Sequence, residues 1–164
     1  MVKYIIMELT SIDYARLISW LAYYKHKTIL NKTQLQKLLF MCYGLYLAKH
    51  NNPLFSDDTP KAWPFGPVFP RTYKRYEESV PEDLSENDKI EFLKDTDTLV
   101  EITNIVDSYY NYSAKSLSEW SHQKDSPWAK TVFSENGGPV TWNKVISQEI
   151  IKDYFKTDTW KKEL

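Results

Sequence analysis

Apolar residues recur at helical spacing along most of the chain. Tyr14, Leu17, Ile18 and Leu21 follow the i, i+3, i+4, i+7 pattern of a helix that turns one face toward a core. The pattern predicts a first helix from residue 10 or 11 to about residue 27.

The next helix has a different pattern. Thr33 and Gln36 form a T-x-x-Q capping box, in which each side chain can satisfy a free backbone amide of the other residue. Residues 35–49 are apolar on nearly every face, which is typical of a central, buried helix. We expect its core residues to be Leu38, Leu39, Cys42, Leu45 and Tyr46.

A proline-rich segment follows. Four prolines and a glycine between residues 60 and 70 forbid a long helix or a central strand there. Proline is favoured in a first helical turn, so a third helix should begin between Pro67 and Pro70 and continue through Tyr76. One minor β pairing is predicted between residues 61–63 and 140–142.

The sequence pattern in the second half of the chain predicts further helices. One covers residues 86–93, and a second capping box at Thr98 and Glu101 opens another. Two more helices begin at the caps Ser113 and Ser126. A turn is predicted at residues 136–139, and the last helix begins after it at Ser147 or Gln148. The expected fold is mainly α: a compact, orthogonal helical assembly of one domain, 1–164, with at most one two-stranded β pairing.

The composition predicts a folded protein without a membrane-spanning segment. Of the 164 residues 42% are hydrophobic and 15% aromatic, which excludes a disordered chain. The longest apolar run, residues 38–48, is too short to span a bilayer, and residues 1–9 lack the features of a secretory signal. We therefore expect a cytoplasmic protein, with Cys42 as a buried structural thiol.

Charge is divided unevenly along the chain. Residues 1–76 hold eleven Lys and Arg against four Asp and Glu, whereas residues 77–164 hold ten against eighteen. The acidic residues are densest between 77 and 101. That segment is interpreted as a solvated connection, with an electrostatic surface that faces a partner as the alternative.

Candidate catalytic and metal-binding residues are few. His26, His50 and His122 each lack a second ligand at metal spacing, and no phosphate-binding loop is present. Ser121, His122 and Asp125 are the residue types of a catalytic triad, but neighbours on one turn rarely reach its geometry. We expect no catalysis, no cofactor and no metal.

The basic first half raises the alternative of a nucleic-acid-binding regulator. Only three arginines occur in the chain, although forked contacts to bases and phosphates favour arginine. The loop between the first two helices is also longer than in a DNA-binding helix-turn-helix. Nucleic acid is therefore not our expected partner, and this function stays as the alternative.

Three stretches, in order, carry a resemblance to a known family. They are Leu30 to Phe40; Pro53 to Phe55 with Ala62 to Val68 and Tyr73; and Leu117 to His122 with Ser126 to Trp128. Together they cover about residues 30–133 and resemble the Panacea domain, the SocA-like and phage-associated GepA-like antitoxin family. Pro64 departs mildly from the family pattern, in which a charged or polar residue is common.

The motif residues are interpreted as mainly structural. Trp63 and Phe65 flank the turn at Gly66 and Pro67, and Trp128 follows a proline cap, so we expect these aromatic side chains in the core. His122 is expected to cap the helix that carries Trp120 or to bridge it to the next segment. The motif positions are Leu35, Lys37, Leu38, Leu39, Trp63, Gly66, Pro67, Tyr73, His122, Pro127 and Trp128.

The resemblance implies an antitoxin of a toxin–antitoxin pair, which neutralises a cognate protein toxin by direct contact. Such a toxin is usually encoded by an adjacent gene, and some members resemble adaptors that deliver the toxin to a Clp-type protease. Charged faces steer association, so we expect a basic face to meet an acidic region of the toxin. That face comprises Arg71, Lys74 and Arg75, together with Lys32 and Lys61.

Overall fold

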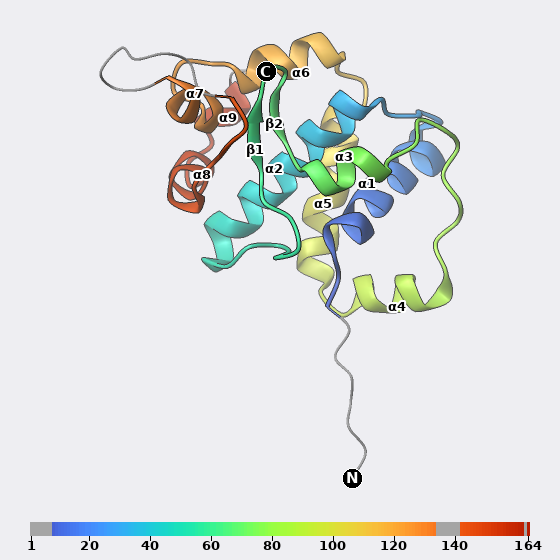
Figure 1. Cartoon of the computed structure of the whole chain (residues 1–164). Helices are drawn as coiled ribbons and strands as arrows, with labels where there is room; N and C mark the ends of the chain where they lie inside the picture. The colour runs from blue at the N-terminus through green and yellow to red at the C-terminus, as the bar shows by residue number, and fades with distance from the viewer. Residues whose placement is uncertain (1–7, 134–141, 163) are drawn as a thin grey trace.

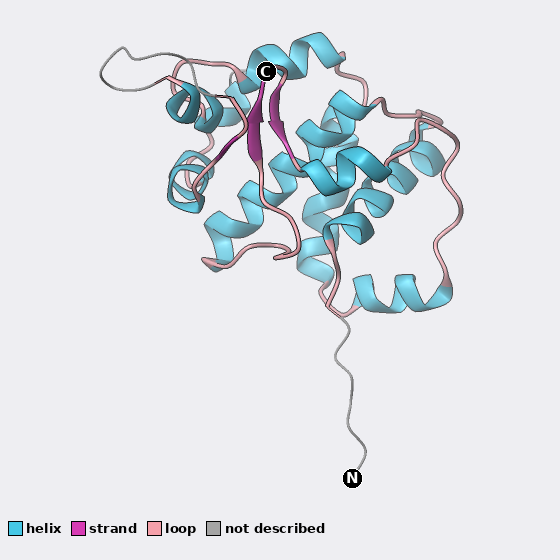
Figure 2. Cartoon of the chain, in the orientation of Figure 1, coloured by secondary structure: helices cyan, strands magenta, loops and turns pink. Residues whose placement is uncertain are grey.

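The computed structural model describes residues 8–133, 142–162 and 164. Figures 1 and 2 show a mainly helical fold with a small sheet, as predicted. The helices of this part of the chain are α1 (Ser11–His26), α2 (Lys32–His50), α3 (Pro70–Arg75), α4 (Glu86–Leu93), α5 (Thr96–Tyr109), α6 (Ala114–Ser121), α7 (Pro127–Val132), α8 (Gln148–Phe155) and α9 (Thr159–Lys162). The strands are β1 (Lys61–Trp63), β2 (Gly66–Val68) and β3 (Lys144–Val145).

Helix α2 is the centre of the fold. It contacts α1, α5, α6, α8 and β2, which explains its apolar residues on nearly every face. Leu38, Leu39 and Cys42 are buried as predicted, whereas Leu45 and Tyr46 are only half-buried. Gly44 lets α8 approach closely, because a Cβ atom at this position would overlap the ring of Phe155.

Most helix starts follow the predicted caps. The hydroxyl groups of Ser113, Ser126 and Ser147 accept hydrogen bonds from backbone amides at the starts of α6, α7 and α8. Helix α4 has the predicted bounds. The short helix α9 was not predicted.

Two predicted capping boxes are wrong. Helix α2 begins earlier, with a box formed by Asn31 and Gln34 in place of Thr33 and Gln36. Asp95 caps α5 by accepting a hydrogen bond from the amide of Thr98 at 3.2 Å. In both cases an earlier Asn or Asp competes with Thr, and those residues are the stronger N-caps.

The sheet differs from the predicted pairing. It has three antiparallel strands in the order β2-β1-β3, and Lys61 lies opposite both Val68 and Val145. The partner of β1 on the β3 side is therefore Lys144–Val145 rather than residues 140–142. Residues 140 and 141 and the predicted turn at 136–139 lie outside the described residues. The prediction that the prolines forbid a central strand here is wrong for β1, because β1 itself contains no proline: Pro64 lies in the turn and Pro67 in the edge strand β2.

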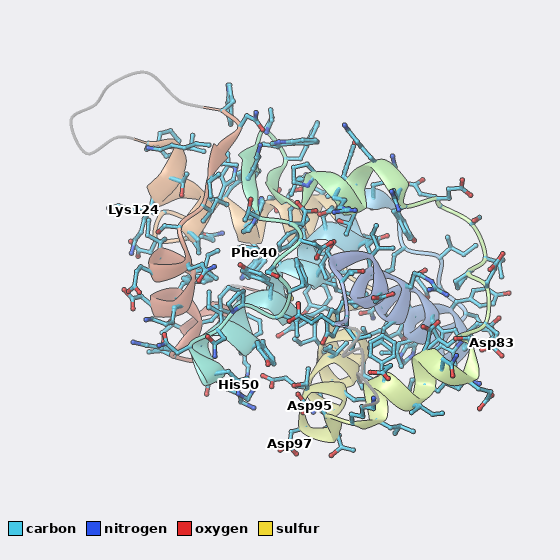
Figure 3. The ribbon with its side chains drawn as sticks, turned by 60° about the horizontal axis from the view of Figure 1, so that its bottom comes forward. Phe40, His50, Asp83, Asp95, Asp97 and Lys124 are labelled. Carbon is cyan, nitrogen blue, oxygen red and sulfur yellow. The ribbon has the colours of Figure 1, made fainter. Side chains whose placement is uncertain are left out.

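The oppositely charged halves of the chain meet in the fold. Basic side chains of α1 and α2 pair with acidic side chains of α4 and α5: Arg16 with Asp88 (3.3 Å), Lys25 with Asp107 (2.8 Å) and Lys49 with Glu101 (3.0 Å). Figure 3 shows Asp83, Asp95 and Asp97 on the α4–α5 side of the molecule, away from Lys124. In the part of the chain that the structure describes, no helix has the length and apolar character needed to cross a membrane.

Candidate functional site

The hairpin of β1 and β2 brings the three resembling stretches together. Its turn lies against α6 and α7 (Figure 1), and side chains of these helices hold its backbone. Trp128 Nε1 donates a hydrogen bond to the carbonyl oxygen of Trp63 at 2.7 Å, and His122 Nε2 lies 2.9 Å from that of Pro64. The ring of His122 also packs edge-on against Trp128, with centroids 3.9 Å apart. His122 is the C-cap of α6 and contacts Trp128 of the next helix, as expected, and its bond to the hairpin is an additional contact.

The protonation of His122 follows from this contact. Burial lowers the pKa of His122, and the charge of Lys37 lowers it further. A carbonyl oxygen only accepts hydrogen bonds, so the neutral imidazole must carry its proton on Nε2. Its role here is that of a donor that fixes the turn.

Lys37 is buried beneath the hairpin. Its side chain is fully enclosed, and its Nζ donates to the carbonyl oxygen of Pro67 at 3.2 Å, with no carboxylate of a described residue within 4.0 Å. Burial without a counter-ion lowers the pKa of Lys37 to about 7. The ammonium group therefore loses its proton at much lower pH than an exposed lysine.

Gly66 packs directly on this buried lysine. Its φ is +114°, a conformation that side-chain-bearing residues rarely adopt, and a Cβ would overlap the Ser121 hydroxyl and the end of Lys37. Glycine is therefore required both by the turn and by the close contact.

Gln36, which was expected only as a capping residue, is a buried connector. Its Oε1 accepts from the amide of Phe69 at 2.8 Å, and its Nε2 donates to the Thr72 hydroxyl at 2.9 Å. These bonds join α2 to the start of α3. A glutamine next to a lysine inside an otherwise apolar helix was the sequence signal for both buried polar residues.

The aromatic residues of the motif are not all in the core. Trp128 is 6% exposed as predicted, whereas Trp63 is half-buried and packs against the Tyr73 ring at 5.1 Å. Phe65 is 70% exposed, so its predicted place in the core is wrong. The turn uses the backbone of Phe65, since its carbonyl oxygen accepts from the Ser118 hydroxyl at 3.1 Å, and its side chain projects outward.

Three of the predicted basic residues share a hollow of about 440 Å³ beside α3. Lys61, Arg71 and Lys74 line it, together with Asp57 and Asp58. The two carboxylates are engaged by the fold itself. Asp57 accepts from the amide and hydroxyl of Ser11, both at 2.8 Å, and Asp58 accepts from the amide of Arg71 at 2.9 Å.

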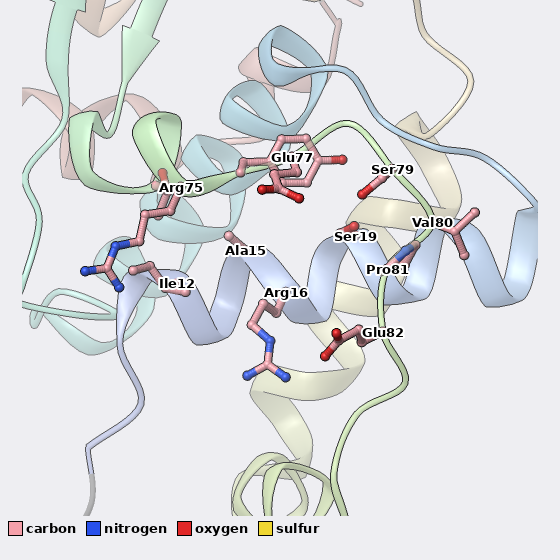
Figure 4. Close-up of a pocket in the computed structure, with 12 residues that line it drawn as sticks. Ile12, Ala15, Arg16, Ser19, Arg75, Glu77, Ser79, Val80, Pro81 and Glu82 are labelled. Carbon is pink, nitrogen blue, oxygen red and sulfur yellow. The ribbon is translucent and has the colours of Figure 1, made fainter.

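The other two predicted basic residues lie elsewhere. Arg75 lines a separate pocket of about 440 Å³ between α1, α3 and residues 76–82, in which Arg16 and Ile12 are its neighbours (Figure 4). Lys32 has its Nζ 4.5 Å from the centre of the Tyr73 ring. Lys32 thus also lies against α3, and Arg75 lines a different pocket from Lys61, Arg71 and Lys74.

The triad-like residues do not form a catalytic arrangement. Ser121 Oγ donates to the carbonyl oxygen of Ser118 at 2.8 Å, and His122 points to the hairpin. Among the described residues there is also no group of three or more His, Cys, Asp or Glu side chains that could hold a metal ion.

Of three comparisons with known proteins, one gives a match. A search of curated proteins and a search of solved structures give no significant match. Comparison with protein families matches residues 35–129 to the family described as antitoxin SocA-like, Panacea domain. The match spans α2, the hairpin, α6 and the start of α7, which are the elements joined by Lys37, His122 and Trp128. The chain belongs to the antitoxin SocA-like, Panacea domain family.

Proposed function

We propose that this protein is an antitoxin that holds a cognate protein toxin inactive by direct contact and catalyses no reaction. The family assignment, over more than half of the chain, carries the proposal. The chemistry of the motif agrees with it, because Lys37 and His122 are engaged in holding the hairpin and the Ser121 hydroxyl donates within α6. The binding energy for a toxin must then come from the surface that this framework supports.

The basic hollow beside α3 supplies one part of such a surface. Lys61 and Lys74 have no carboxylate of a described residue within 4.0 Å, and Arg71 has only a long contact of 3.9 Å to Asp57. The three cations outnumber the two carboxylates of the hollow, so its net positive charge can attract an acidic region of a partner. Steering of this kind raises the association rate more than the final affinity.

The experiment is coexpression with the product of the adjacent gene. If that product is the toxin, it should arrest growth when it is expressed alone. Coexpression of this protein should restore growth, and the two proteins should copurify. Failure of both rescue and copurification would refute the proposal. A parallel measurement of the toxin level, with and without a Clp-type protease, separates simple neutralisation from delivery for degradation.

The alternative of a nucleic-acid-binding regulator has weaker support. Several cations of the basic half already pair with acids of α4 and α5, including Lys25 with Asp107 and Lys49 with Glu101. Those charges are not free to replace phosphate counterions. A salt-dependent shift of its own operator DNA by the isolated protein would nevertheless establish that function.

A further inference from the structure

The apex of the hairpin combines a fixed backbone with an exposed aromatic side chain. The carbonyl oxygens of residues 63, 64, 65 and 67 are each contacted by a buried or half-buried side chain from α2, α6 or α7. Phe65 is nevertheless 70% exposed, more than any other large hydrophobic residue of the described chain. A side chain on a fixed turn loses little backbone freedom when it binds, so more of its contact energy remains as affinity.

Other exposed apolar side chains lie around the same end of the molecule. Phe133 and Trp142 each have ring centres 6.0 Å from that of Trp128, whose Nε1 donates to the hairpin at the Trp63 carbonyl oxygen. Both are about half exposed. We call Phe65, Phe133 and Trp142 the apical patch. Exposed apolar patches of this kind mark interaction sites.

The charges around the apical patch are mainly positive. The described residues of α6 and α7 with their connection, and of the segment 142–147, include four lysines and two acids. The lysines are Lys115, Lys124, Lys130 and Lys144, and the acids are Glu119 and Asp125. Lys61 of the hairpin lies instead in the hollow with Asp57 and Asp58. The acidic residues Asp83, Asp95 and Asp97 lie on another side of the molecule (Figure 3). A partner that covers the patch should therefore be acidic at its rim.

We propose that Phe65 is the anchor that this protein inserts into an apolar pocket of its toxin, and that acidic side chains border this pocket. The inference rests on the proposed antitoxin function and names the contact that this function uses. A central aromatic residue surrounded by charged residues is the usual arrangement of a binding hot spot and its rim. Phe133 and Trp142 extend the apolar contact, and the lysines set its orientation.

The decisive variant is Phe65→Ala. Because the side chain is exposed, the melting temperature should change little, while affinity for the purified toxin from the adjacent gene should fall about tenfold or more. Phe65→Leu, which keeps an apolar side chain, should lose less. Leu93→Ala is the matched control, since Leu93 is 58% exposed at the end of α4, and it should bind as the wild type does. Unchanged affinity of Phe65→Ala would overturn the inference.

The acidic rim is tested separately with the double variant Lys130→Glu, Lys144→Glu. Association with the same toxin should slow by about tenfold at low salt and much less at high salt. The double variant Lys156→Glu, Lys161→Glu, at the C-cap of α8 and in α9, changes the net charge by the same amount and is the control. An association rate that does not respond to the double variant would remove the acidic rim from the inference.

The binding measurements also separate the anchor role of Phe65 from the antitoxin function itself. If the wild-type protein neither binds nor neutralises the toxin, the proposed function fails, and the anchor fails with it. If the wild type binds and Phe65→Ala binds equally well, only the anchor fails. If sedimentation shows a wild-type dimer that Phe65→Ala dissociates, while toxin affinity is unchanged, the patch joins two copies of this chain instead.

Discussion

The hairpin of β1 and β2 and the basic hollow beside α3 are neighbours in sequence but are constructed in opposite ways. The hairpin backbone is held by Trp128, His122 and Lys37, at donor–acceptor distances of 2.7 to 3.2 Å. The hollow presents Arg71 and Lys74 on exposed side chains, with one long ion pair of 3.9 Å. The difference indicates that substitutions under the hairpin act on stability, whereas substitutions in the hollow act on association.

The largest loss of stability should come from replacing Trp128, the buried tryptophan that holds the hairpin. Trp128→Ala removes a 6% exposed ring and the donor to the Trp63 carbonyl, and should lower the free energy of unfolding by about 3–5 kcal/mol. Trp63→Ala should cost less, because that side chain is half-buried. Chemical denaturation of both variants measures the difference. Equal losses of unfolding free energy in the two variants would show that the exposure of Trp63 does not govern its contribution to stability.

Gly66→Ala should cause the second-largest loss of stability. The new Cβ would strain a backbone at φ +114° and press on Ser121 and Lys37, so we expect a loss of about 2–3 kcal/mol in the free energy of unfolding. Thermal melting followed by circular dichroism measures it. A variant as stable as the wild type would mean that the turn can adopt another conformation, and the fixed hairpin would then be in question.

Lys37→Met tests the buried amine through pH. Burial lowers the pKa of Lys37 to about 7 in the folded chain, against about 10.4 in the unfolded chain. Between these values the unfolded chain binds one more proton, so wild-type stability should rise with pH by about 1.4 kcal/mol per pH unit. The Met variant should lack this rise.

The comparison between wild type and Lys37→Met is needed because other groups titrate nearby. Burial raises the pKa of the Cys42 thiol and of Tyr14, so both groups oppose stability at alkaline pH. Both are present in each protein, so their contribution cancels in the difference. A difference that stays constant from pH 7 to pH 9 would contradict the prediction of a neutral, buried amine.

The smallest effect on stability should be that of Arg71→Glu with Lys74→Glu. Both side chains are exposed, and exposed ion pairs contribute about 0–1 kcal/mol, so the melting temperature should hardly change. Association with the toxin should slow at low salt and recover as salt screens the charges. If association is unaffected at low salt, the hollow takes no part in steering.

The sequence predicted the helices well because their signals are local. The stripe of Tyr14, Leu17, Ile18 and Leu21 is buried in α1, and the serine caps of α6, α7 and α8 lie where expected. The errors arose where two local signals competed, as Asn31 with Thr33 did. The stronger N-cap prevailed in each case, and Gln36 was left to contact Thr72 in the tertiary structure.

The candidate site was predicted in part. Its motif positions do converge, but the sequence could not show that Phe65 contributes its backbone to the turn and its side chain to the surface. An aromatic residue beside a glycine has the same pattern in either case. The burial of Lys37 was equally hidden, because only the folded hairpin supplies the carbonyl oxygen that accepts its hydrogen bond.

The close packing of Phe155 on Gly44 has a consequence for synthesis on the ribosome. Helix α2 is complete at His50, but α8, which covers it, ends about a hundred residues later. At translation rates of about 5–20 residues per second, the face of α2 that α8 covers stays exposed for roughly 5–20 s in the nascent chain. An exposed apolar face is the kind of surface that chaperones bind, so we expect the yield of folded protein to depend on how fast the C-terminal helices emerge.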